Sequence, residues 1–158
     1  MTITISSFAW VPPFAQGYVK DIRPRWALAE AGLDYDLHLL SDGAQDHADY
    51  RAWQPFGQVP AYRDDTVELF ESGAIVLHIA SLSELLAPQS QQEAAHIQAW
   101  VIAALNSIEP EVDDLHAPVE REHHVPRRQI AVDDLQVFVA GLELVRVVQP
   151  AERVVVDA

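Results

Sequence analysis

Hydrophobic and polar residues alternate at the start of the chain and then change to helical spacing. Residues 2–7 alternate threonine or serine with isoleucine, which is typical of a strand with one buried face. An apolar segment follows and stops at Gly32, a residue type that commonly ends helices. Pro24 lies inside this segment and is tolerated only in a first helical turn, so Asp21 is expected as the N-cap. If the helix began near Gly17 instead, Pro24 would kink it.

Similar patterns continue through the first half of the chain. Further strands are predicted at 35–40, 59–63 and 67–70, and further helices at 48–53 and 72–86. Asp64-Asp65-Thr66 predicts a hairpin-like turn between the last two strands. The order strand–helix–strand–helix–strand–strand–helix matches a thioredoxin-like α/β domain, with a right-handed first crossover, which we place at residues 1–87.

The second half of the chain carries helical patterns only. Residues 89–92 predict a polar linker and helix start, and residues 94–109 have the spacing of an amphipathic helix, which Pro110 should kink or end. Residues 116–126 are charged and interrupted by prolines, as in an exposed loop, and 130–148 predict another helix. We therefore expect an all-α domain over residues 88–158.

Composition and charge narrow the classes of function. Ten basic and 24 acidic residues give a net charge of −14, which argues against nucleic acid or an anionic membrane surface as a non-specific partner. The chain has no cysteine, so disulfides and a thiol nucleophile are excluded. It also lacks a recognisable signal peptide and any apolar stretch near the about 18 residues of a spanning helix. A soluble cytoplasmic protein is expected.

Two motifs, eleven residues apart, together suit a small zwitterionic peptide. The first, Gln58-Val59-Pro60, predicts extended backbone at Val59, which can pair with the main chain of a ligand. The second, Glu71-Ser72, predicts a strand end that runs directly into a helix. The helix start at Ser72 offers free N–H groups and a positive dipole end to a carboxylate, and Glu71 offers a negative charge to an ammonium group.

This pair of motifs resembles the glutathione site of the glutathione S-transferase family. Residues 25–33 look like the end of that family's first helix, and residues 103–110 look like the first long helix of its all-α domain in bacterial members. The resemblance implies a cis proline at Pro60, a contact of Gln58 with the glycine end of glutathione, and glutathione as co-substrate. It further implies a homodimeric detoxification enzyme that adds the glutathione thiolate to a small hydrophobic electrophile.

Each assigned residue also has a plain structural interpretation. Pro60 could be an ordinary trans proline that opens a strand. Ser72 could be an N-cap only, with Glu71 as a solvated charge, and Gln58 could be a surface residue.

The residue that activates the thiol is the next expectation. The family places a Ser, Tyr or Cys near the start of its first helix, where hydrogen bonding lowers the thiol pKa. Tyr18 lies closest to that place, whereas Ser6 and Ser7 come too early in the chain. The alternative for Tyr18 is a partly buried aromatic residue at a helix start.

The segment after Leu115 departs from the family pattern. Ala131 stands where a later buried helix of the family has a capping hydroxyl, and the domain is expected to be abbreviated. A catalytically silent binding or scaffold protein is therefore an alternative function, as is a glutathione-dependent isomerase. His116, His123 and His124 invite a metal interpretation, but a solvated loop explains them better and no metal site is expected.

Overall fold

The computed structural model describes residues 2–110, and the chain divides into two compact units, Met1–Gln89 and Ser90–Ala158. The predictions for residues 116–126, 130–148 and the three histidines lie outside the described residues. No helix among the described residues is long and apolar enough to cross a membrane.

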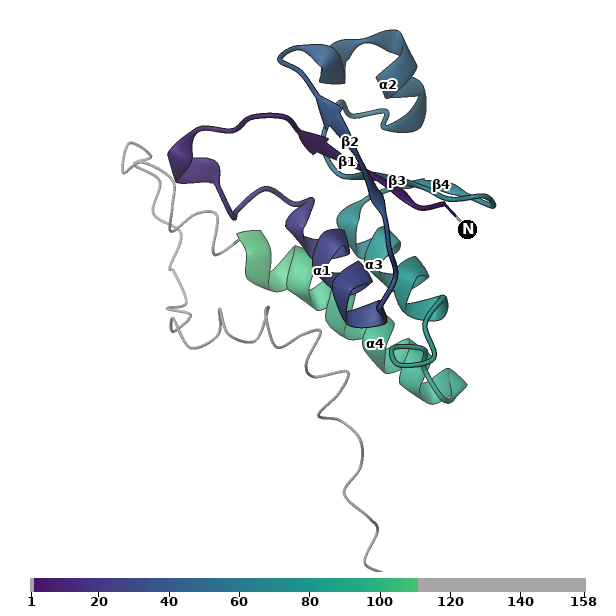
Figure 1. The fold of residues 1–158 in the computed structure, drawn as a ribbon. Helices are drawn as coiled ribbons and strands as arrows, with labels where there is room; N and C mark the ends of the chain where they lie inside the picture. Colours follow the sequence, from purple (N-terminus) through teal and green to yellow (C-terminus); the bar gives the residue numbers. More distant parts are fainter. Residues whose placement is uncertain (1, 111–158) are drawn as a thin grey trace, which may run out of the picture. The chain divides into compact units, whose positions relative to one another are not determined.

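The first unit is built on a mixed sheet of four strands (Figure 1). In spatial order the strands are β2 (Asp36–Leu40), β1 (Thr4–Phe8), β3 (Ala61–Arg63) and β4 (Glu68–Phe70). β1 pairs with β2 in parallel, whereas β3 pairs with both β1 and β4 in the antiparallel sense. With its flanking helices this sheet is the predicted thioredoxin-like α/β domain.

Helices cover both faces of the sheet (Figure 1). α1 (Ile22–Ala31) and α3 (Ser72–Ser81) lie on one face, and α2 (Ala48–Trp53) lies on the other. Because side chains alternate along a strand, neighbouring residues of β1 serve different cores. On the α1/α3 face the core consists of Ile3, Ile5, Ala27, Leu28, Tyr62, Ile75 and Ile79. On the α2 face it consists of Leu40, Tyr50, Trp53, Val59 and Ala61.

The ends of α1 agree with their local sequence signals. The helix begins after Asp21, so Pro24 falls in the first turn, where its missing N–H removes no hydrogen bond. It ends at Gly32, whose left-handed conformation (φ 67°) lets its N–H donate to carbonyls of the last turn. The interpretation with a helix start near Gly17 is therefore wrong.

Several boundaries of the first unit differ from the predictions, those of the strands by one or two residues and that of α3 by more. α3 ends at Ser81 and does not continue to residue 86. The cause is Ser83, whose hydroxyl accepts from the Leu85 N–H while its carbonyl accepts from Ala87, so the chain turns although the apolar spacing continues. β3 begins at Ala61, two residues later than predicted. Two short 3₁₀ helices, η1 (Pro13–Ala15) and η2 (Ala44–Asp46), lie in the connections.

The second unit begins with α4 (Gln91–Ala103), which starts within the predicted linker and helix start at residues 89–92. Ser90 is its N-cap and accepts from the Glu93 N–H at 3.1 Å. A π-helical turn, η3 (Ala104–Ile108), continues the helix towards Pro110. Since a proline ring clashes with the carbonyl four residues earlier, here that of Asn106, a wider turn is the expected local response. The predicted disturbance therefore lies just before the proline.

Candidate functional site

The two predicted ligand-binding motifs meet at one end of the β3–β4 hairpin. Ala61 pairs with Phe70 across the two strands. Pro60 directly precedes Ala61 and Glu71 directly follows Phe70, so the two motifs are neighbours just beyond this pair. The Val59–Pro60 peptide bond is cis, as the resemblance implied, and the trans alternative is wrong.

The start of α3 has the free N–H groups that a carboxylate site needs. Ser72 is the first helical residue and Glu71 is the N-cap, so the interpretation of Ser72 as the cap itself is wrong. Ile75 is the first residue whose N–H bonds back into the helix, to the Glu71 carbonyl at 3.0 Å. The N–H groups of Ser72, Gly73 and Ala74 therefore have no partner within the helix. These N–H groups lie at the positive end of the helix dipole, which attracts an anion.

The backbone of Glu71 is strained. Its φ is 70° and its ψ is 114°, a region that residues with a side chain rarely adopt. Such a conformation costs on the order of 1–3 kcal/mol. In return it turns the chain directly from β4 into α3, which leaves the Glu71 side chain exposed beside the helix start.

Arg23 is a charged residue of this region that the sequence analysis missed. It lies in the first turn of α1, and its Nη1 donates to the Ser72 Oγ at 3.0 Å. The hydroxyl, the helix start and a guanidinium group thus gather at one place, and each favours a carboxylate. One signal was present in the sequence, because a cation in the first turn of a helix opposes the helix dipole and needs another reason to be there.

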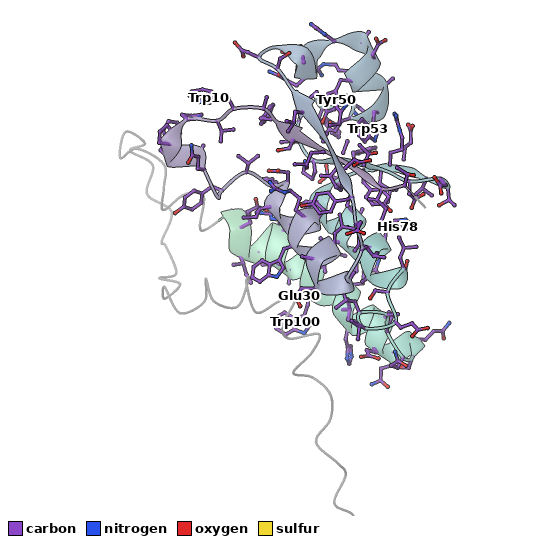
Figure 2. All side chains as sticks on the ribbon, in the orientation of Figure 1. Trp10, Glu30, Tyr50, Trp53, His78 and Trp100 are labelled. Atoms are coloured by element: carbon purple, nitrogen blue, oxygen red, sulfur yellow. The ribbon has the colours of Figure 1, made fainter. Side chains whose placement is uncertain are left out.

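Gln58 and Val59 are held from the α2 side of the sheet. Val59 is buried in the core that contains Leu40 and Trp53. The Gln58 carbonyl accepts from the Tyr50 hydroxyl at 2.6 Å, while the Gln58 side chain is exposed. Figure 2 shows Tyr50 and Trp53 together beneath α2. This arrangement fixes the backbone of the first motif and leaves a polar side chain available at its edge.

Tyr18 lies in a turn four residues before the first residue of α1. Its side chain is 69% exposed, which does not fit the alternative of a partly buried aromatic at a helix start. Its neighbour Val19 packs against the core that contains Val59, so the loop returns to the sheet at this point. Earlier in the same loop Trp10 and Phe14 are also exposed, and Figure 2 shows Trp10 well apart from Tyr50.

Charged and polar groups elsewhere form a second cluster around Asp64. This carboxylate accepts from Tyr62 Oη at 2.7 Å and contacts His78 Nε2 at 2.8 Å. Burial by itself raises the pKa of Asp64, but hydrogen bonds from His78, Thr66 and Tyr62 together outweigh burial and hold that pKa well below its ordinary value. Burial and the same carboxylate raise the pKa of Tyr62. Within residues 2–110 no group of three or more His, Asp or Glu residues could hold a metal ion.

Known proteins with a similar sequence or fold agree with this geometry. Residues 17–81 match the family model described as glutathione S-transferase, N-terminal domain. Glutathione S-transferase 4 of Zea mays is 32% identical over 114 residues, which are 69% of this chain and 48% of the relative. Glutathione S-transferase 1 of Zea mays is 38% identical over 93 residues, 52% of this chain and 44% of the relative.

Solved structures give the same result. A theta class glutathione S-transferase from Xanthomonas axonopodis pv. citri, solved with glutathione bound, is 26% identical with a TM-score of 0.60. That alignment covers 89% of this chain and 62% of the other. This chain spans about half the length of the curated relatives it matches. The match over residues 17–81, the maize relatives and the shared thioredoxin-like domain together show that the chain belongs to the glutathione S-transferase family.

Proposed function

We propose that this protein binds glutathione at the shared end of β3, β4 and α3 and adds its thiolate to a small hydrophobic electrophile. The observation that carries the proposal is the strand register, which places Pro60 and Glu71 side by side at the start of α3. The contact between Arg23 and Ser72 supports it, because it adds a positive charge where a carboxylate would bind. A family member of 26% identity has been solved with glutathione bound.

Each residue has one role in this proposal. The helix start at Ser72 receives the carboxylate of the γ-glutamyl end, and Glu71 faces its ammonium group. The backbone of Val59, held next to Pro60, pairs with the main chain of the tripeptide, and Gln58 reaches its glycine end.

The reaction is a nucleophilic substitution at, or addition to, a carbon atom of the electrophile, with the glutathione sulfur as the nucleophile. The glutathione thiol gives its proton to solvent, and the thiolate forms a carbon–sulfur bond with the electrophile. In a substitution, the bond to the leaving group breaks with its electron pair. In an addition, a π bond of the electrophile opens and the resulting anion takes a proton from solvent. Tyr18 donates a hydrogen bond to the thiolate, which stabilises the charged form and lowers the thiol pKa.

Calorimetry with glutathione tests the binding proposal. The unmodified protein should bind, and Ser72→Ala should weaken binding about tenfold or more, since a hydrogen bond to a charged group is worth about 1.5–3 kcal/mol. The matched control is Ser81→Ala at the opposite end of α3, where the hydroxyl donates to the His78 carbonyl. Equal affinity of Ser72→Ala and the unmodified protein would remove the carboxylate role.

A catalytically silent glutathione-binding protein is the second candidate. The observation in its favour is the exposure of Tyr18, because a hydroxyl surrounded by water stabilises a thiolate less than a buried one. Glutathione binding without conjugation of a chromogenic aryl halide would select this function. If that assay is negative, the isomerase expectation is tested with a glutathione-dependent isomerisation assay.

The family also informs the setting of the proposed function. We expect residues 88–158 to form a second, all-α domain and the protein to act as a homodimer. We also expect a cytoplasmic role in detoxification, because the cytoplasm contains the reduced glutathione that the reaction consumes.

A further inference from the structure

Two buried hydroxyl groups meet on the α2 face of the sheet, and so far only the bond from Tyr50 to the Gln58 carbonyl has been described. Ser6 belongs to β1 and is fully buried, and Tyr50 belongs to α2 and is 5% exposed. Their oxygens lie 2.8 Å apart although the residues are 44 positions apart in the chain. A buried hydroxyl destabilises the fold unless its hydrogen bonds are satisfied, so each hydroxyl of this pair is expected to have further partners.

The hydrogen bonds of the pair have one consistent direction. The Tyr50 hydroxyl donates to the Gln58 carbonyl at 2.6 Å, and a phenol has only one proton to donate. In the bond between the two hydroxyls Ser6 must therefore be the donor. The Ser6 oxygen in turn accepts from the Ala61 N–H at 2.6 Å. The result is a directed chain from the Ala61 N–H through Ser6 and Tyr50 to the Gln58 carbonyl.

This series of hydrogen bonds holds both ends of one four-residue segment. Gln58 and Ala61 are its first and last residues, and Val59 and Pro60 lie between them. The segment is the part of the proposed site that pairs with the ligand through its backbone. Because the two hydroxyls are buried, water does not compete for these bonds, and hydrogen bonds in such a chain strengthen one another.

Aromatic packing does not explain the hydroxyl of Tyr50. Its ring contacts Trp53 edge to face, with centroids 5.9 Å apart, and stacks near His38, with centroids 6.5 Å apart. A phenylalanine ring would keep both contacts. Burial raises the pKa of Tyr50, and the hydrogen bond from Ser6 only partly offsets this effect. The phenol therefore keeps its proton throughout the neutral range and remains a donor to Gln58.

We propose that Ser6 and Tyr50 form a hydroxyl clamp that holds the backbone of Gln58–Ala61 in the geometry to which glutathione binds. The ligand part of this inference rests on the proposed function. Tyr50 and Ser6 are positioning residues, since they act through the backbone of Gln58 and Ala61 and not by touching the ligand.

The test compares two matched substitutions, Tyr50→Phe and Tyr62→Phe. Each removes one buried phenol donor next to β3, but the Tyr62 hydroxyl donates to Asp64 and its side chain lies in the α1/α3 core. Both variants should unfold at lower denaturant concentration than the unmodified protein. Only Tyr50→Phe should weaken glutathione binding, by about tenfold if two backbone hydrogen bonds to the ligand are misaligned.

Amide hydrogen exchange gives a readout that needs no ligand. In the unliganded protein Tyr50→Phe should accelerate exchange at Val59 and Ala61 relative to other amides of the sheet, and Tyr62→Phe should not. Ser6→Ala, a smaller change that serves if Tyr50→Phe fails to fold, should accelerate exchange at Ala61, whose partner it removes. The affinity losses of Ser6→Ala and Tyr50→Phe should not add in the double variant if the two hydroxyls act as a unit.

Several results would overturn the clamp. Equal affinity losses in Tyr50→Phe and Tyr62→Phe would mean that general destabilisation is the cause. Additive losses in the double variant would mean that the hydroxyls act separately. If the unmodified protein bound no glutathione, the proposed function would fail, and exchange would still decide the clamp. In that case the clamp is supported if exchange at Val59 and Ala61 is faster in Tyr50→Phe but not in Tyr62→Phe. Equal exchange in the two variants overturns the clamp.

Discussion

Three side chains at the starts of two helices carry most of the chemistry proposed for this protein. Ser72 and Arg23 are in contact, so the two side chains proposed to bind the carboxylate lie together. Tyr18 differs, because its hydroxyl is exposed and lies in a turn before α1. We therefore expect single substitutions to separate the proposed binding of glutathione from its proposed activation.

Tyr18→Phe tests the activation step. The change removes a hydrogen-bond donor to the thiolate and keeps the ring, so the fold and the glutathione affinity should survive. The conjugation rate at neutral pH should fall, and its pH profile should move to higher pH, because the thiolate becomes harder to form. Steady-state rates with a chromogenic aryl halide across pH would show both effects.

Tyr35→Phe is the matched control for this experiment. The Tyr35 hydroxyl accepts a hydrogen bond from Arg25 of α1 at 3.3 Å, and it has no proposed role in activation. This control should keep the unmodified pH profile. A Tyr18→Phe variant with the unmodified rate at every pH would move the activating role to Gln16, Trp10 or a backbone N–H of the loop.

At the scale of the elements, the β3–β4 hairpin is held together by the carboxylate of Asp64. Asp64 accepts from the Thr66 N–H at 2.6 Å, the Thr66 hydroxyl at 2.7 Å and the Val67 N–H at 2.9 Å, which closes the turn. It also bonds to Tyr62 of β3 and to His78 in the last turn of α3. One carboxylate thus ties the hairpin that carries the site to the helix that completes it.

Asp64→Asn should destabilise the protein in a pH-dependent way. The pKa of Asp64 is lower in the folded than in the unfolded protein, so its stabilising effect is present above the unfolded value of about 4 and is lost as pH falls below it. At neutral pH the variant should lose on the order of 3 kcal/mol of unfolding free energy, because buried donors lose a charged partner. The difference from the unmodified protein should shrink as pH falls below about 4.

Urea unfolding at a series of pH values measures this effect. Asp65→Asn is the control, since Asp65 is the exposed neighbour in the same turn, and its effect should stay within about 0.5 kcal/mol. A difference between Asp64→Asn and the unmodified protein that stays constant down to pH 2 would contradict the assignment.

The boundaries of these elements show which signals a sequence carries locally. Gly32 and Asp21 define α1 through their own backbone preferences, so both ends could be predicted. Ser83 ends α3 through hydrogen bonds that the apolar spacing does not reveal. The start of α4 lies within the predicted linker and helix start at residues 89–92, where Ser90 and Glu93 form a recognisable capping pattern.

The site was predictable to the extent that it is written in contiguous motifs. Gln58, Val59 and Pro60 form one motif and Glu71 and Ser72 the other, and the cis bond at Pro60 and the helix start at Ser72 agree with what was expected of them. Arg23 and the hydroxyl clamp of Ser6 and Tyr50 were not predicted. Their contacts span 49 and 44 positions of sequence and exist only once the helices pack on the sheet.

The whole protein is expected to self-associate, as the family resemblance implies. Large apolar side chains remain exposed over the described residues of the first unit, among them Trp10, Phe14, Phe56 and Leu85. The net charge of −14 opposes close approach of two copies. Sedimentation at micromolar concentration should therefore show a dimer whose population rises between low and physiological salt, as the repulsion is screened. A monomer at every salt concentration would contradict this expectation.

The strained backbone at Glu71 has a consequence for engineering the protein. Glu71→Gly would relieve a backbone strain of about 1–3 kcal/mol and add about 0.5–1 kcal/mol of unfolded-state entropy, so we expect a small net rise in thermal stability. The same exchange deletes the charge proposed to hold the ammonium group of glutathione. Thermal stability and the proposed binding of glutathione thus favour different residues at position 71. A directed-evolution screen for only one of these properties would reduce the other.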